Sequence, residues 1–187
     1  MVIAKLKRRE NIAEYILYLW QLEDLFRALQ FSPEAIFSQL AAPMQADDET
    51  KQEVFLWYME LIDLLKAEGK EVHGHLEHTL HLIGSLQELH EALLALPAGA
   101  EYRKVFTPLA SELPALKARL GRAEMSDIEF CLRALYSVML YRIKGDEAHR
   151  EYVDDVMTLV SPAIALLTKL NREIEEGSFD LCKNEQP

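Results

Sequence analysis

Apolar residues near the start of the chain recur every three or four positions, which is the spacing of one α-helix. They are Ile12, Tyr15, Ile16, Leu19, Leu22, Phe26 and Leu29. Only seven glycines and seven prolines interrupt the 187 residues. The long stretches between them are rich in Leu, Ala, Glu, Lys and Gln, which are good helix formers. The sequence therefore predicts an all-α protein.

Helix breakers and capping residues divide the chain into about six or seven helices. We expect helices over about 7–30, 32–40, 47–68, 70–96, 126–145 and 146–176, the last bent near Pro162. Between 100 and 121, Pro108 and Pro114 each remove a backbone donor, and each is expected to kink or restart a helix. Short connections favour antiparallel neighbours. We expect a single-domain antiparallel bundle over 1–187, with 176–187 as a frayed tail.

Local signals mark several of the expected helix starts. Ser32 is a good N-cap and is followed by Pro33, which suits the first helical position. Ser126 with Glu129 three residues later forms a capping-box signature. The acidic run 47–49 complements the positive end of the helix that follows it. These signals locate the first residues of the predicted helices more narrowly than the spacing of apolar residues does.

Composition excludes some classes of partner. The formal net charge is −11, which disfavours binding to the phosphates of nucleic acids or to anionic lipid, because both require a positive surface. Lys5, Lys7, Arg8 and Arg9 form a basic cluster at the start of the chain. Such a cluster could steer a partner, but at an exposed terminus it more often only increases solubility.

The sequence shows no sign of export or of membrane insertion. Glu10 and Glu14 interrupt the apolar stretch that could be mistaken for a signal peptide, and no small-residue cleavage site follows. The longest charge-free run in the last helix, 156–168, is shorter than the roughly 18–20 residues that span a bilayer. Cys131 and Cys182 have neither metal-ligand spacing nor a disulfide pattern. These features favour a soluble cytoplasmic protein.

The run KRRENIAEYILYLWQLEDLFRA, residues 7–28, resembles the opening of an uncharacterised all-helical bacterial family, catalogued only as a domain of unknown function. The likeness is clearest over about residues 5–30 and extends over the chain by length and helix order. It implies an α-helical single domain. It implies no catalytic residue, cofactor or partner, because none is established for that family.

The segment HGHLEHTLH, residues 73–81, holds four of the six histidines. On a helix over 70–96, His73, Glu77 and His81 would form one stripe opposite the apolar half, which includes Val72. Imidazole and carboxylate groups one turn apart can bind zinc or another divalent transition metal. However, the stripe would face water without a second shell of supporting groups. Weak adventitious binding is therefore more credible than a physiological metal site.

Two further positions carry chemistry within apolar surroundings. Glu23 and Arg27 are four residues apart and lie on the same helical face as Ile16 and Trp20, so they can pair. A buried pair would need additional hydrogen bonds, because desolvation of two charges is costly. It could be a ligand-facing charge or an internal structural ion pair. His90 lies among apolar neighbours, where a histidine is more often a core residue than a catalyst.

No catalytic constellation is visible in the sequence. There is no G-x-S-x-G elbow, phosphate-binding glycine loop or dinucleotide fingerprint, so we expect neither an enzyme nor a cofactor. The favoured hypothesis is a non-enzymatic cytoplasmic helical bundle that binds a protein partner, or itself, through an exposed apolar or charged face. The alternative is a metal- or small-molecule-binding bundle that uses the histidine-rich helix with Glu23, Arg27 or His90.

Overall fold

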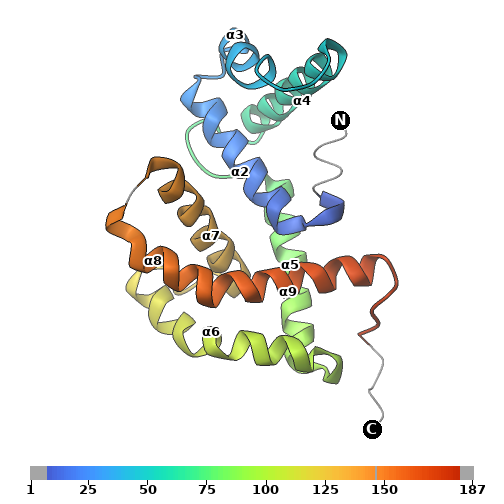
Figure 1. Ribbon diagram of the computed structural model, residues 1–187, viewed down its shortest axis with the longest axis vertical. Coiled ribbons are helices and arrows are strands. Elements are labelled where there is room, and N and C mark those ends of the chain that lie inside the picture. Colours follow the sequence, from blue (N-terminus) through green and yellow to red (C-terminus); the bar gives the residue numbers. More distant parts are fainter. Residues whose placement is uncertain (1–7, 146, 182–187) are drawn as a thin grey trace. The chain divides into compact units, whose positions relative to one another are not determined.

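All regular secondary structure in residues 8–145 and 147–181, the part of the chain that this computed structural model describes, is helical (Figure 1). The α-helices are α2 (Ile12–Ala28), α3 (Pro33–Ile36), α4 (Asp48–Ala67), α5 (Glu77–Ala95), α6 (Ala100–Arg119), α7 (Asp127–Lys144), α8 (Arg150–Asp155) and α9 (Ser161–Glu175). Two π-helical turns, η1 (Phe37–Ala41) and η4 (Val156–Val160), and two 3-10 turns, η2 (Pro97–Gly99) and η3 (Glu147–His149), join them. The all-α prediction is confirmed.

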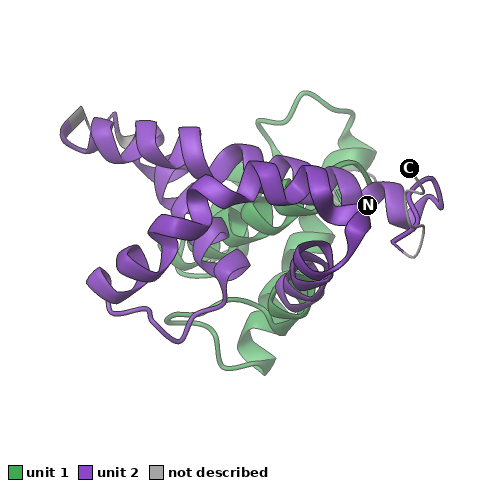
Figure 2. Ribbon diagram, turned by 90° about the horizontal axis from the view of Figure 1, so that it is seen from below, with its two compact units in different colours: residues 1–82 green, residues 83–187 purple. Residues whose placement is uncertain are grey.

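The chain forms two compact units, residues 1–82 and residues 83–187 (Figure 2). The boundary between them falls inside α5, so this helix begins in unit 1 and ends in unit 2. The expectation of a single domain stays a prediction. Of the expected tail, residues 182–187 lie outside the described residues, as do Lys5 and Lys7 of the basic cluster.

The predicted N-caps are confirmed. The Ser32 hydroxyl accepts a hydrogen bond from the Ala35 N–H at 3.3 Å, and the Ser126 hydroxyl accepts one from the Glu129 N–H at 3.2 Å. Asp47 caps α4 in the same way, through the Thr50 N–H at 2.8 Å. Each cap satisfies a backbone donor that the first helical turn leaves without a partner.

In unit 1 an aromatic core joins α2 to α4. Phe26 of α2 is fully buried and meets the Tyr58 ring edge to face, with centroids 5.4 Å apart. Tyr18 stacks on Trp57 at 6.3 Å. Burial raises the pKa of the Tyr18 hydroxyl, and the neighbouring Tyr58 raises it further. These large rings account for much of the apolar area that unit 1 buries.

In unit 2, α9 packs against both α6 and α7. Leu109 and Leu113 of α6, Leu132 of α7 and Leu167 of α9 are at most 2% exposed. Burying a leucine side chain contributes about 1.5–3 kcal/mol relative to leaving it in water. Contacts of this kind join the three helices around one apolar core.

The two internal prolines lie inside one continuous helix, α6, so the expected restart of a helix between 100 and 121 was wrong, whereas the expected kink stays a prediction. Pro108 and Pro114 both lie on the exposed side of a continuous helix. Each costs roughly 3 kcal/mol inside a helix. The opposite face of α6 buries four large side chains, Tyr102, Phe106, Leu109 and Leu113. Their burial, at about 1.5–3 kcal/mol each, offsets the cost of two prolines.

Both π-helical turns end two residues before a proline. The Ala42 N–H bonds to the Phe37 carbonyl ahead of Pro43, and the Ser161 N–H bonds to the Val156 carbonyl ahead of Pro162. A proline ring clashes with the carbonyl four residues earlier and donates no hydrogen bond. The preceding turn therefore widens from i→i−4 to i→i−5 bonding. The irregularity expected near Pro162 is this π turn, which separates α8 from α9.

The histidine-rich helix begins later than predicted, at Glu77 rather than near residue 70. The backbone turns at Gly69 and Gly74, whose φ angles are +66° and +89°, a conformation that glycine adopts without strain. The Arg27 guanidinium binds the carbonyls of Lys70 and Gly74. In residues 69–76, hereafter the 69–76 loop, these carbonyls therefore bond to a side chain, which competes with the backbone hydrogen bonds of a helix.

Candidate functional site

Glu23 and Arg27 do come together in unit 1. Arg27 Nη2 lies 4.0 Å from Glu23 Oε2, and the Glu23 side chain is 1% exposed. Arg27 also forms a shorter ion pair with Asp24, with Nη1 and Oδ1 2.9 Å apart. The longer distance to Glu23 shows that Arg27 is not the main partner of that carboxylate.

The closest partner of Glu23 is His75, in the 69–76 loop. His75 Nδ1 lies 2.7 Å from Glu23 Oε2 and must donate the hydrogen bond, because an ionised carboxylate only accepts. The Leu76 N–H donates to the other Glu23 oxygen at 3.3 Å. Glu23, Arg27 and His75 form what we call the loop clamp, which holds the 69–76 loop on α2. Helical spacing could not identify His75, because the two groups are 52 residues apart in sequence.

The loop clamp continues into a set of contacts around Trp20. The His75 ring stacks on the Trp20 indole with centroids 4.3 Å apart and planes at 18°. Trp20 Nε1–H donates to Thr79 Oγ1 at 3.2 Å, and that hydroxyl donates to the Leu76 carbonyl at 2.7 Å. Among the described residues, no buried side-chain nitrogen or oxygen lacks a hydrogen-bond partner. The clamp therefore fits the structural interpretation of the Glu23–Arg27 pair.

The proposed metal stripe does not form on one helix. His73 precedes α5, so only Glu77 and His81 share that helix, and all three side chains are exposed. The described residues contain no group of three or more His, Cys, Asp or Glu side chains that could hold a metal ion. The helical argument for the stripe was therefore wrong, and metal binding at these residues stays a prediction. Val72, expected on the apolar face, is 86% exposed.

His90 is a core residue of unit 2, as its apolar neighbours predicted. It is 1% exposed and its ring lies edge to face with Phe106 at 4.5 Å. Burial lowers the His90 pKa, and the Asp127 and Glu91 carboxylates offset this only in part. Burial also raises the pKa of the Tyr102 hydroxyl. The Tyr102 hydroxyl therefore keeps its proton, and it forms a hydrogen bond with His90 Nδ1 at 2.7 Å.

The other ring nitrogen of His90 faces a carboxylate. Nε2 is 3.8 Å from Asp127 Oδ2, while Asp127 Oδ1 accepts from Lys117 Nζ at 2.8 Å. Burial raises the pKa of the nearby Cys131 thiol to about 12, which keeps it protonated and unreactive. His90 and Tyr102 lie beneath the surface, so the arrangement stabilises the core of unit 2 rather than presenting a reactive group.

Unit 2 also contains a groove of about 770 Å³ among α6, α7 and the segment α8–η4, which we call the unit 2 groove. Its apolar lining consists of Pro108, Leu109, Leu116, Leu120, Phe130, Ala134, Ala148, Val156, Leu159 and Val160. Its polar lining consists of Glu112, Arg119, His149, Glu151, Tyr152 and Asp155. The sequence analysis missed this site, because its walls come from helices far apart in the chain.

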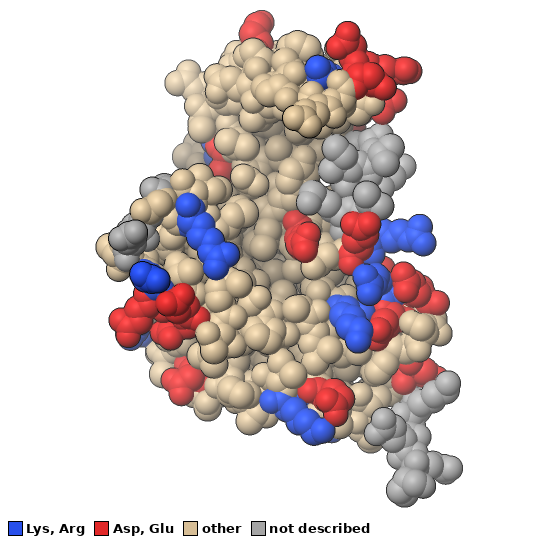
Figure 3. Space-filling model, viewed as in Figure 1, with Lys and Arg blue, Asp and Glu red and all other residues tan. Residues whose placement is uncertain are grey.

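Charged and apolar residues occupy different levels of the unit 2 groove. Leu109 and Val160 at its base are 1% and 4% exposed, whereas Leu120 at its edge is 54% exposed. Glu112, Glu151 and Asp155 are exposed. In the space-filling view, acidic side chains gather over α8 (Figure 3). The groove thus has an apolar floor and a mainly acidic rim.

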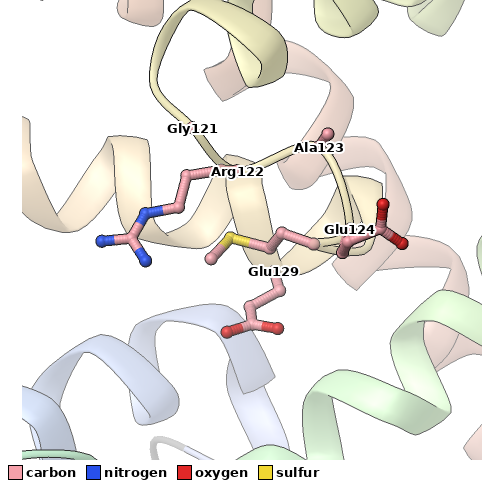
Figure 4. Close-up of a pocket in the computed structure, with 6 residues that line it drawn as sticks. Gly121, Arg122, Ala123, Glu124 and Glu129 are labelled. Carbon is pink, nitrogen blue, oxygen red and sulfur yellow. The ribbon is translucent and has the colours of Figure 1, made fainter.

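A second hollow of about 490 Å³ lies at the turn between α6 and α7. It is lined by Gly121, Arg122, Ala123, Glu124, Met125 and Glu129. The charged side chains of Arg122, Glu124 and Glu129 point in different directions (Figure 4). Glu129 is also paired with Arg133, with Nη2 and Oε1 2.8 Å apart. The polar groups do not converge on a common point, so this hollow is a weaker candidate than the unit 2 groove.

Comparison with known proteins places the chain in a family. A family model described as Domain of unknown function (DUF4924) matches residues 1–178. The chain belongs to this family. The match to DUF4924 spans both compact units and confirms the resemblance that residues 7–28 suggested. No curated protein and no solved structure matches the chain. Within the described part of this DUF4924 member, no helix is both long enough and apolar enough to cross a bilayer.

Proposed function

We propose that this protein is a non-enzymatic, cytoplasmic helical-bundle protein that binds a protein partner through the unit 2 groove. The observation that carries the proposal is the apolar floor of that groove, which opens at an edge where Leu120 is 54% exposed. Leu116 and Leu159 of the lining are also only partly buried, and apolar side chains left uncovered in a folded protein are the usual mark of an interaction site.

Two polar clusters elsewhere in the chain are less suited to binding a partner than the unit 2 groove. In the loop clamp, the Glu23 carboxylate already accepts two hydrogen bonds, from His75 and from the backbone of Leu76. In unit 2, His90 is held by Tyr102 inside the core. Both clusters use their polar atoms on other parts of the chain, whereas the groove presents side chains to an incoming molecule.

The arrangement of the lining favours a protein segment over a small ligand. Small-molecule sites combine an apolar cavity with a few polar groups that converge on the ligand. Here the charged groups Glu112, Glu151 and Asp155 lie exposed along the rim instead. A polar rim around an apolar centre is the organisation of protein interfaces.

The composition of the chain is consistent with this setting. A net charge of −11 disfavours nucleic acid as the partner. The buried Cys131 is a free thiol, which suits the reducing conditions of the cytoplasm. The partner can be another protein or a second copy of this chain.

Site-specific photo-cross-linking in living cells tests the proposal. A photoreactive amino acid is placed at Leu120, on the groove, and in a matched control at Leu56 of α4 in unit 1. Both leucines are 54% exposed, so the two positions differ in location and not in accessibility. We expect a discrete protein adduct from position 120 and none from position 56.

A third version tests whether the adduct depends on the groove floor. Leu116→Glu places a charge within the groove, and Leu116 is only partly buried, so the fold can be checked by circular dichroism. The adduct at position 120 should then disappear. The proposal is wrong if position 120 gives no adduct, or if positions 56 and 120 give the same adducts.

A further inference from the structure

The described rim of the unit 2 groove carries an excess of negative charge. Glu112, Glu151 and Asp155 are exposed, and none of them forms an ion pair with another described residue. Among the described residues of the lining, Arg119 is the one permanently cationic side chain. The described lining thus contains three acidic side chains and one guanidinium around an apolar floor.

Unpaired charge at the rim of an interface contributes more to the choice of partner than to the affinity for that partner. Complementary rim charges raise the association rate and suppress partners of the wrong sign. An acidic rim therefore favours an occupant that carries Lys or Arg. The apolar lining imposes a second requirement, because Leu116, Leu120 and Leu159 are at least partly exposed and offer only apolar contacts.

The walls of the groove set the length of the occupant. The α6 wall runs from Pro108 to Leu120 and the opposite wall from Ala148 to Val160. Twelve residue steps at the helical rise correspond to about 18 Å, or roughly three helical turns. Helices that bind in grooves place apolar anchors at i, i+3, i+4 and i+7 over a comparable length.

Resting on the proposed function, we infer that the occupant of the unit 2 groove is an amphipathic helix of a partner protein, about three turns long, with Lys or Arg beside its apolar face. The basic side chains meet Glu112, Glu151 and Asp155, and the apolar side chains fill the floor. The partner is thus defined by chemistry: short, helical, apolar on one side and cationic at the margins.

Two synthetic peptides and two charge-reversal variants test this inference. The probes are fluorescent helical peptides of about 12 residues with leucines on one face and, on the other, lysines in one peptide and glutamates in its counterpart. The groove variant is Glu151→Lys with Asp155→Lys. The control is Glu60→Lys with Asp63→Lys on the exposed side of α4, which changes the net charge equally. Binding is measured by fluorescence anisotropy at physiological ionic strength, where distant charges are screened.

We expect the lysine peptide to bind and the glutamate peptide not to bind. The groove variant should weaken the lysine peptide at least about tenfold, and the control variant less than about twofold. Equal weakening by both variants would mean that net charge alone attracts the peptide, and would overturn the inference. Binding of the glutamate peptide, or no binding of the lysine peptide, would also overturn it.

The two proposals can fail separately. An adduct at position 120 without any preference for the lysine peptide rejects the cationic helix but keeps the groove as a protein-binding site. The absence of both an adduct and peptide binding rejects the groove itself. All four substituted carboxylates are exposed, so the variants should retain the helical circular-dichroism spectrum of the parent chain.

Discussion

Units 1 and 2 each hold a histidine in a side-chain network, His75 with 11% and His90 with 2% of its side chain exposed, and the partners of the two rings differ. In unit 1, His75 donates to the Glu23 carboxylate and stacks on Trp20, so a charged acceptor holds a loop. In unit 2, His90 Nδ1 forms a hydrogen bond with the Tyr102 hydroxyl inside an aromatic cluster. The difference teaches that residue type and helical phase do not decide whether the closest partner of a histidine is a carboxylate or a hydroxyl. The groups that the fold brings against it decide.

This contrast determines what single substitutions should do in each region. A buried carboxylate with several donors leaves all of them without a partner when it is removed. Loss of one neutral hydrogen bond in an aromatic cluster leaves fewer buried groups without a partner. The stability of unit 1 should therefore depend more on a buried charge. The stability of unit 2 should depend more on packing and should fall at low pH.

The largest effect is expected at Glu23. Glu23→Leu removes the acceptor of His75 Nδ1–H and of the Leu76 N–H, and it should lower the free energy of unfolding by about 3–5 kcal/mol. Urea denaturation followed by circular dichroism measures the change. Glu23→Gln keeps an acceptor oxygen and should cost less. Asp24→Asn is the control, because Asp24 is 46% exposed and an exposed ion pair contributes less than about 1 kcal/mol.

Equal losses in Glu23→Leu and Asp24→Asn would contradict the distinction between a buried clamp and a surface pair. If Glu23→Gln were as damaging as Glu23→Leu, the negative charge itself, and not the acceptor geometry, would stabilise the loop.

Smaller effects on stability are expected from alanine substitutions at two glycines, Gly99 and Gly84. The two effects should have opposite signs, because the space around an added Cβ differs. A Cβ added at Gly99 would lie 1.8 Å from the Leu93 carbonyl oxygen, so Gly99→Ala forces the backbone to move and should cost about 1–3 kcal/mol. At Gly84 in α5 nothing lies within 4 Å of an added Cβ. Gly84→Ala should therefore stabilise the chain by about 0.5–1 kcal/mol. Thermal unfolding of the two variants gives the signs directly.

Stabilisation by Gly99→Ala would show that the start of α6 is looser than this close approach indicates. Destabilisation by Gly84→Ala would mean that this face of α5 is covered in the folded chain.

The third effect depends on pH. Burial lowers the His90 pKa below its ordinary value of 6.5, so below that pH the unfolded chain takes up a proton that the folded chain does not. Stability should then fall as the pH drops from 6.5 towards the folded pKa, by about 1.4 kcal/mol for each unit of difference. His90→Gln should reduce this acid dependence in urea titrations at pH 7.5 and pH 5.

Part of the acid dependence should survive in His90→Gln. Partial burial of the ring also lowers the His78 pKa, and the neighbouring Arg8 and His81 lower it further, whereas Glu68 raises it. A double variant with His78→Gln separates the two contributions. An unchanged pH dependence in both variants would show that neither histidine couples protonation to folding.

Much of the fold followed from the sequence because local rules sufficed. The Ser32 and Ser126 caps and the periodicity of α2 depend on residues within a few positions of each other. The prediction for 70–76 failed because Glu23 and Arg27, far away in sequence, bind that segment. The expected restart of a helix within 100–121 does not occur, because burial of Tyr102 and its neighbours outweighs two prolines.

The candidate site was less predictable than the fold. Pairing of Glu23 with Arg27 followed from their spacing, but the closer partner His75 did not. The unit 2 groove joins residues of α6 to residues more than thirty positions later in α8 and η4. The spacing of apolar residues within one helix does not indicate a surface that two distant segments form together. The unit 2 groove can therefore be recognised only in the folded chain.

Hydrogen exchange measured with and without the lysine peptide tests most directly whether the groove or the loop clamp is the binding region. The groove predicts new protection of backbone amides confined to residues 108–120 and 148–160, with none in the 69–76 loop. Protection centred on the 69–76 loop, with the groove segments unchanged, would contradict the account.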